Sequence, residues 1–235
     1  MFPEKCRDAA RIYLKGGYSV IPVTWDKVPH PYLLASAQGM LKQLPWFHQG
    51  SYKLVYTGSF KLEPFYQAPQ AHLFDKLFPA ENIDILWLSG SRGNFEVVRV
   101  RGYGVAICAI PKSYSILDFD LKGMPATLDV VGLAEEVAAR LNTFTVASPH
   151  RGIHVYMRLS SLGNDEQRGW RIGGAELKFK GYCVAPPTKC FCEKCRPLRK
   201  GWTAINYMPV KQLPMADPKF VMSLVYSLLD KFSST

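Results

Sequence analysis

Residues 114–122 read Tyr-Ser-Ile-Leu-Asp-Phe-Asp-Leu-Lys, an apolar stretch of strand composition that ends in two carboxylates. Successive side chains of a strand point to opposite faces, so Asp118 and Asp120 lie on the same face and could share one metal site. Carboxylates this close repel each other unless a proton or cation intervenes, and their hard oxygen atoms suit Mg²⁺ or Mn²⁺. Taken alone, an Asp-x-Asp pair is more commonly the acidic end of an ordinary strand, so the pattern needs support from elsewhere in the chain.

Strands and helices are predicted on both sides of this stretch. Short apolar segments bounded by turns containing Gly or Pro predict strands, and apolar residues at helical spacing predict helices. We expect strands at about 18–23, 83–88, 96–100, 105–110, 114–120, 143–147, 153–159, 175–179, 182–185 and 202–207. We expect helices at about 4–15, 128–141 and after Pro218, and one near 33–44 in the otherwise unassigned stretch 29–70. The expected fold class is α/β (α+β), one domain over 1–235 with a mixed or antiparallel sheet flanked by helices, because short loops favour antiparallel pairing.

A turn that leads into a strand forms the second motif. Residues 147–158 read Ala-Ser-Pro-His-Arg-Gly-Ile-His-Val-Tyr-Met-Arg, with Pro149 and Gly152 marking the turn. Backbone beside a small residue can approach a phosphate closely, and Arg151 and His154 could donate hydrogen bonds to the triphosphate of a nucleotide. The alternative is a histidine packed at the start of a strand, which this segment alone would favour.

The third motif is a short strand with a carboxylate and an amine on one face. Residues 174–181 read Gly-Ala-Glu-Leu-Lys-Phe-Lys-Gly, and strand alternation places Glu176 and Lys178 on the same side. Glu176 could complete a metal site of three carboxylates, and Lys178 could neutralise a phosphate. The alternative is a solvated surface pair of little consequence.

Three cysteines lie within six residues, at Cys190, Cys192 and Cys195, in a basic segment at about 188–201. This spacing suits a metal better than a disulfide framework, and three thiolates with one more ligand would hold Zn²⁺. The alternative is a set of reduced surface cysteines. Either interpretation places the chain in a reducing compartment, so we expect a cytoplasmic location, and the longest apolar runs are too short for a membrane helix.

The order and spacing of the three motifs resemble those of the archaeo-eukaryotic primase superfamily, particularly the bifunctional primase-polymerases of plasmids and viruses. The resemblance extends to the opening Ala-Arg-Ile-Tyr-Leu-Lys-Gly-Gly-Tyr-Ser-Val-Ile-Pro-Val at 10–23, to Lys27 and Pro29, to Asn82, and to Val-Ala-Pro-Pro at 184–187. It covers most of residues 1–188, and the middle region matches least clearly.

This resemblance implies template-directed DNA primase and DNA polymerase activity, by two-metal phosphoryl transfer on a single-stranded DNA template with a primer strand and dNTP or NTP. Its metal ligands would be Asp118, Asp120 and Glu176, and its nucleotide-binding residues would be Ser148, Arg151, His154 and Lys178. The family commonly has aspartate where this chain has Glu176, whose side chain is longer by one methylene group. Ser148 and Arg151 match the family's phosphate-binding turn only loosely.

The resemblance also bears on the zinc ligands and on the partners of the chain. Related primase-polymerases carry a zinc-bearing stem near this turn, which favours His150 as the fourth zinc ligand, with Cys183 as the alternative. The family also suggests a helicase, as a separate protein or domain, as a partner.

The net charge of +10 favours a polyanionic ligand such as nucleic acid, although a merely basic, soluble surface would have the same composition. Two other functions fit the same residues. Clustered carboxylates and a histidine also serve metal-dependent nucleases. A non-catalytic, zinc-stabilised nucleic-acid-binding module would account for the charge and the cysteines, but not for the order of the acidic motifs.

Overall fold

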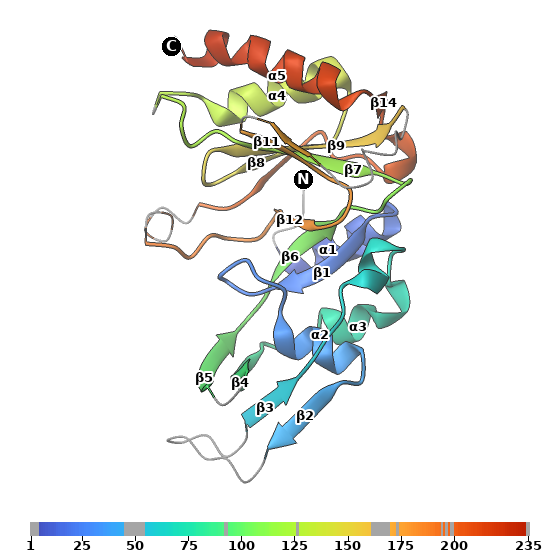
Figure 1. Ribbon diagram of the computed structural model, residues 1–235, viewed down its shortest axis with the longest axis vertical. Helices are drawn as coiled ribbons and strands as arrows, with labels where there is room; N and C mark the ends of the chain where they lie inside the picture. The colour runs from blue at the N-terminus through green and yellow to red at the C-terminus, as the bar shows by residue number, and fades with distance from the viewer. Residues whose placement is uncertain are drawn as a thin grey trace.

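Three β-sheets and the helices around them make up the computed structural model, which describes residues 5–44, 55–91, 94–125, 127–160, 170–172, 174–193, 195, 197 and 200–233 (Figure 1). The α-helices are α1 (Cys6–Lys15), α2 (Pro31–Ala37), α3 (Phe74–Leu77), α4 (Val130–Leu141) and α5 (Pro218–Ser233), with short 3₁₀ helices at η1 (Glu63–Tyr66), η2 (Ala71–Leu73) and η4 (Val210–Gln212). The strands are β1 (Ser19–Val23), β2 (Leu41–Leu44), β3 (Val55–Gly58), β4 (Asp84–Ser91), β5 (Asn94–Arg101), β6 (Gly104–Cys108), β7 (Ser115–Asp120), β8 (Thr145–Ser148), β9 (Gly152–Leu159), β10 (Trp170–Ile172), β11 (Ala175–Lys178), β12 (Tyr182–Ala185), β13 (Thr203–Ile205) and β14 (Met215–Ala216).

The central sheet has the strand order β10-β11-β7-β9-β8-β13, with β14 added in parallel to β9. A second sheet has the order β1-β6-β12 and is antiparallel throughout. The third has the order β2-β3-β4-β5 and includes the parallel pair β3 and β4. The expected mixed α/β class with largely antiparallel pairing is therefore confirmed, although the strands are divided among several sheets.

Among the four strands from β4 to β7, which short loops connect, only β4 and β5 pair with each other. β6 lies between β1 and β12, and β7 lies between β11 and β9, so the chain changes sheets between β6 and β7. Every residue of β6 is buried, which suits the centre of a covered sheet. The hairpin after β6 closes with a single bridge between Ile110 and Tyr114 before the chain enters the central sheet.

The expected helix near 33–44 was wrong over its second half. α2 ends at Ala37, and Gly39 follows with a φ of 69°, a left-handed conformation that terminates helices and favours glycine. The chain then forms β2, which pairs with β3. The apolar spacing of 33–44 therefore spans a helix, its glycine stop and an edge strand.

Two hydrophobic cores lie on opposite faces of the central sheet. One core joins the sheet to α4 and α5, and its members include Leu117, Phe119 and Leu177. The other joins it to α1 and the β1-β6-β12 sheet through stacked and edge-on aromatic rings, among them Tyr18 and Tyr156. Figure 1 shows α4 and α5 above the central sheet, α1 and the three-stranded sheet below it, and β2 to β5 at the far end. The polar side chains that alternate with the apolar ones on β7, β9 and β11 therefore face the three-stranded sheet.

Candidate active site and metal centre

Glu176, Asp118 and His154 form a row across three neighbouring strands. In the antiparallel register Glu176 pairs with Asp118, and Asp118 pairs with His154. Side chains at paired positions lie on the same face of a sheet with Cβ atoms about 5 Å apart. Residues from the three motifs, far apart in sequence, are thus brought side by side, with Asp118 of the first motif between the other two residues.

A close approach of two backbones fixes the end of this row. The amide of Asp120 donates to the carbonyl of Gly174 over 2.7 Å. A Cβ at position 174 would lie 2.7 Å from the carbonyl oxygen of Asp120, closer than side chains tolerate. Likewise, a Cβ at position 152 would lie 2.7 Å from the carbonyl oxygen of Phe119. Glycine at both positions lets β9 and the strand turn at 174 flank the carboxylates.

Asp118 is the centre of the charged contacts. Its Oδ1 lies 3.5 Å from Nε2 of His154, and its Oδ2 lies 3.4 Å from Nζ of Lys178. The thiol of Cys183, on β12 of the facing sheet, donates to the same Oδ2 over 3.7 Å. The Asp118 side chain is 28% exposed and that of His154 8%, so the carboxylate can be reached from solvent while the imidazole is almost enclosed.

The electrostatic setting keeps His154 neutral and Glu176 ionised. Burial lowers the pKa of His154 below its usual value, and the opposing charge of Asp118 does not reverse this. Partial burial would raise the pKa of Glu176, but the hydrogen bonds from Lys178 and Arg171, at 2.7 Å and 2.9 Å, lower it overall. In the free chain both cations therefore hold the carboxylate that the third motif supplies.

Asp120 sits at the exposed end of β7, with 58% of its side chain accessible, and pairs with Lys122 at 3.0 Å. It shares two adjoining cavities with Asp118. One, of about 420 Å³, is lined by all three predicted carboxylates together with Lys122, Arg171 and Gly174. The other, of about 270 Å³, is lined by Asp118 and Asp120 together with Ser148, His150, His154, Cys183 and Lys27.

The structure does not bring Arg151 to these cavities. Arg151 has a φ of 64°, and its Nη2 donates to the carbonyl of Pro125. Its side chain lines a different cavity, with Asp129 and Lys200. Ser148, by contrast, borders both this cavity and the one at Asp118, and its Oγ accepts from the amide of Gly152 at 3.0 Å. The left-handed residue in the turn thus directs Arg151 away from the carboxylates.

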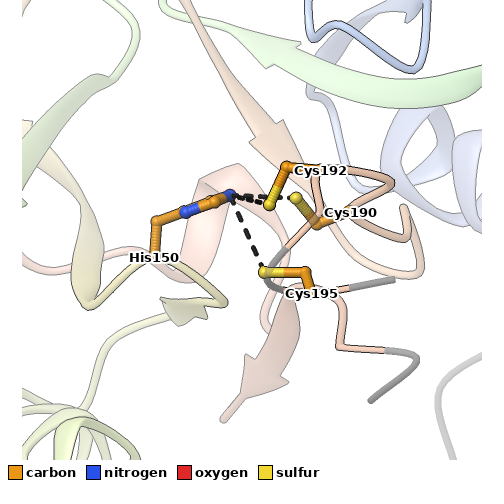
Figure 2. Close-up of side chains that lie close together, drawn as sticks. All are labelled: His150, Cys190, Cys192 and Cys195. Carbon is orange, nitrogen blue, oxygen red and sulfur yellow. Dashed lines mark hydrogen bonds between the residues drawn. The ribbon is translucent and has the colours of Figure 1, made fainter. Parts of the chain in front are cut away.

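A Cys₃His cluster that could hold a metal such as zinc lies beside the same turn. Nε2 of His150 is 2.9 Å from Sγ of Cys190, 3.7 Å from Sγ of Cys192 and 3.9 Å from Sγ of Cys195 (Figure 2). Tetrahedral zinc with one nitrogen and three sulfur ligands places the nitrogen roughly 3.5 Å from each sulfur. Figure 2 shows the imidazole and the three thiols pointing towards one common point. All four ligand atoms lie within 4.8 Å of one another.

The cysteines lie on a small hairpin whose ends are tied together. Lys189 pairs with Gly201, and the amide of Cys190 donates to the carbonyl of Lys200 over 2.9 Å. Four residues of the predicted zinc-binding segment, 194, 196, 198 and 199, lie outside the described residues. The structure brings His150 to the three cysteines, whereas Cys183 lies at Asp118.

Comparison with known proteins adds no relative. No family model matches the chain, and neither does any curated protein. None of the helices in the described part of the chain combines the length and apolar character needed to cross a bilayer.

The sequence motifs did not indicate that Cys183 would contact Asp118. The two residues lie on different sheets, and a contact between sheets cannot be predicted from the pattern of residues within one segment. Lys122, two residues after Asp120, could have been found, because a lysine at that distance can reach a carboxylate at a strand end.

Proposed function

We propose that this chain is a template-directed nucleotidyltransferase of the primase-polymerase type. The observation that carries the proposal is the row of Glu176, Asp118 and His154 in register on β11, β7 and β9, with Asp120 at its open end. Strand pairing, which is independent of the spacing along the chain, gathers the same side chains that the resemblance assigns to catalysis. This agreement supports the proposal.

The larger cavity is where the proposed synthesis would need its divalent metal ions. Asp118, Asp120 and Glu176 all line it, and oxygen ligands suit Mg²⁺ or Mn²⁺. In the free chain lysines and an arginine neutralise the same oxygens, so ions would take over a role that Lys122 and Lys178 now fill. When bound there, the ions would activate the attacking 3′-hydroxyl and stabilise charge on the leaving pyrophosphate.

The surrounding side chains would bind and orient the nucleotide. His154, kept neutral by burial, can donate one hydrogen bond to a phosphate oxygen without a competing charge. Lys178, once released from Asp118, still holds Glu176 and adds positive charge beside the phosphates. Lys122 and Lys27 line the cavities and would offset the charge of the triphosphate.

The zinc hairpin and the neighbouring loop offer a surface for single-stranded DNA. The rings of Trp25 and Phe191 stack at 4.3 Å, and both residues are more than one-third exposed. Exposed aromatic rings beside lysines are typical of surfaces that stack on unpaired bases. Phe191 lies between Cys190 and Cys192, so zinc at the cluster would hold the stacked pair in place.

The experiment that tests the proposal measures synthesis on single-stranded DNA with labelled nucleotides and Mg²⁺ or Mn²⁺, with and without a primer. We expect product from the native chain and a loss of at least about 100-fold in the double variant Asp118→Asn plus Asp120→Asn, since removing such electrostatic groups costs this much. Asp8→Asn, on the exposed side of α1, serves as the control.

Product that forms without a primer would identify a primase, and product only with a primer would identify a polymerase. Shortening of labelled DNA without nucleotides would instead indicate the nuclease. DNA binding by a folded chain with no synthesis in either metal would reject the proposal and favour a binding module.

A further inference from the structure

A second group of possible metal ligands lies inside the smaller cavity. It consists of Asp118 on β7, His154 on β9 and Cys183 on β12, and one ligand atom from each lies within 4.8 Å of the others. The first two belong to the central sheet and the third to the sheet that faces it. The packing of the two sheets therefore adds a thiol to the carboxylate row.

The three donors differ in kind, and together they suit one class of metal ion. Carboxylate oxygen, imidazole nitrogen and thiolate sulfur all bind zinc, whereas a thiol is a poor ligand for the harder Mg²⁺. We propose that Asp118, His154 and Cys183 form a binding site for a thiophilic divalent cation such as Zn²⁺, separate from the Cys₃His cluster. A water molecule from the cavity would complete a coordination of four.

Two contacts of Asp118 must change when the cation binds, one with Lys178 and one with Cys183. Lys178 lies 3.4 Å from Oδ2 of Asp118 but only 2.7 Å from Oε2 of Glu176. It can therefore leave Asp118 and keep its shorter ion pair. The thiol of Cys183, which donates to Asp118 in the free chain, loses its proton to solvent as the metal–sulfur bond forms.

This second site is chemically and spatially distinct from the first. The two groups have no residue in common, and the Cys₃His cluster offers three sulfur atoms where the second group offers one. His150 and Cys183 nevertheless line the same cavity, so both sites can be filled from one solvent-accessible space. The native chain should accordingly bind zinc at two positions.

Occupation of the second site has a consequence for activity. The cation would be coordinated by the carboxylate of Asp118, which the proposed synthesis needs as a ligand for Mg²⁺ or Mn²⁺. It would also be coordinated by His154, which is proposed to bind the nucleotide. Zinc should therefore inhibit by competing with the catalytic ions. This consequence rests on the proposed function, whereas the binding itself does not.

Binding is tested on the metal-free full chain, by measuring bound zinc per chain at controlled free zinc. We expect two ions for the native chain and one for Cys183→Ser, because losing even an outer-shell partner costs roughly 10- to 100-fold in metal affinity. The matched control is Cys108→Ser, which alters a buried cysteine on the adjacent strand β6 and should still bind two.

A second measurement does not depend on any variant folding. Cadmium-113 NMR of the native chain should give two resonances, one from a site with three thiolates and one from a site with a single thiolate. A single resonance, or an unchanged zinc content in a folded Cys183→Ser chain, would overturn the site.

Inhibition is read from synthesis with Mg²⁺ as zinc is added, each chain being normalised to its own rate without zinc. We expect inhibition of Cys183→Ser to require at least about tenfold more zinc than inhibition of the native chain or Cys108→Ser. Equal inhibition of all three would reject competition at Asp118. If no chain synthesises DNA, the proposed function fails, and the metal content and cadmium spectra still decide the site.

Discussion

Glu176 stands where the family that the three motifs resemble commonly has aspartate, and its carboxylate is held by two cations. Lys178 and Arg171 hold its carboxylate at the edge of the row, and its side chain is 36% exposed. We expect Glu176→Gln to lower synthesis at least about tenfold while changing the free energy of unfolding by less than about 1 kcal/mol. The pair with Arg171 is exposed and contributes little to stability, and the more buried Lys178 keeps Asp118 as a partner.

Steady-state rates and urea unfolding measure these two effects. Glu135→Gln, on the exposed face of α4, is the matched control and should alter neither quantity. An unchanged rate in Glu176→Gln would mean that two carboxylates suffice and that Glu176 belongs to the surface ion pairs.

His30 gives a pH dependence that is independent of the active site. Its Nδ1 accepts from the amide of Leu33 at 3.3 Å and caps α2, while Nε2 lies 3.2 Å from the carbonyl oxygen of Gly102. Burial lowers the pKa of His30 from 6.5 to about 4. Between these values the unfolded chain binds the proton and the folded chain does not, so stability falls as the pH falls.

From pH 7 to pH 5 this histidine should cost about 2 kcal/mol of the free energy of unfolding. Urea unfolding at both pH values checks the number. His30→Asn should reduce the loss by that amount, leaving the contribution in the same direction from buried His154, whose pKa is also lowered. The exposed control His72→Asn should keep the full dependence, and a His30→Asn chain that did so as well would contradict the assignment.

Among the elements, the turn between β8 and β9 links the two candidate sites. Ser148 at its start lines the cavity at Asp118, His150 at its middle belongs to the Cys₃His cluster, and His154 follows on β9. Removing zinc should therefore loosen both the hairpin at 188–201 and this turn. We expect a chelator to lower the free energy of unfolding by about 3 kcal/mol when zinc had been present at 100 times its dissociation constant.

Thermal unfolding with and without chelator measures this effect, and hydrogen exchange locates it. Protection should fall in β8 and in the start of β9, but not in α1. The double variant Cys190→Ala plus Cys183→Ser, which removes a ligand from each of the two proposed zinc sites, should unfold like the chelated native chain and be insensitive to chelator, whereas Cys108→Ala should respond as the native chain does. A chelator effect confined to the hairpin would separate the two sites.

How far the elements could be predicted depends on the range of the interactions involved. Period-two alternation is local, so it placed Asp118 and Asp120 on one face and Glu176 with Lys178 on another strand, as the structure has them. Strand order is not local. Neither the insertion of β7 between β11 and β9 nor the facing position of Cys183 follows from any single segment. The side chain of Arg151 was likewise decided by a left-handed backbone at its own turn position.

For the molecule as a whole, the net charge of +10 has two interpretations: a binding surface for nucleic acid, or a surface that is merely basic. Under the first interpretation, lysines at particular positions contact the DNA. Lys27 and Lys122 line the cavities at the carboxylates, whereas Lys219 lies at the exposed start of α5, on the other face of the central sheet. If single-stranded DNA enters by the cavities, the first two lysines contact phosphate and the third does not.

The salt dependence of binding to a labelled single-stranded oligonucleotide tests this. Each phosphate contact adds about −0.7 to the slope of log affinity against log salt, so Lys27→Gln plus Lys122→Gln should make the slope shallower by about 1.4. Lys219→Gln should leave it unchanged. A slope in the double variant equal to that of the native chain would mean that the lysines at the carboxylates bind no DNA. A change in slope that depends only on how many lysines are removed, and not on where they lie, would mean that the positive charge acts only through its total.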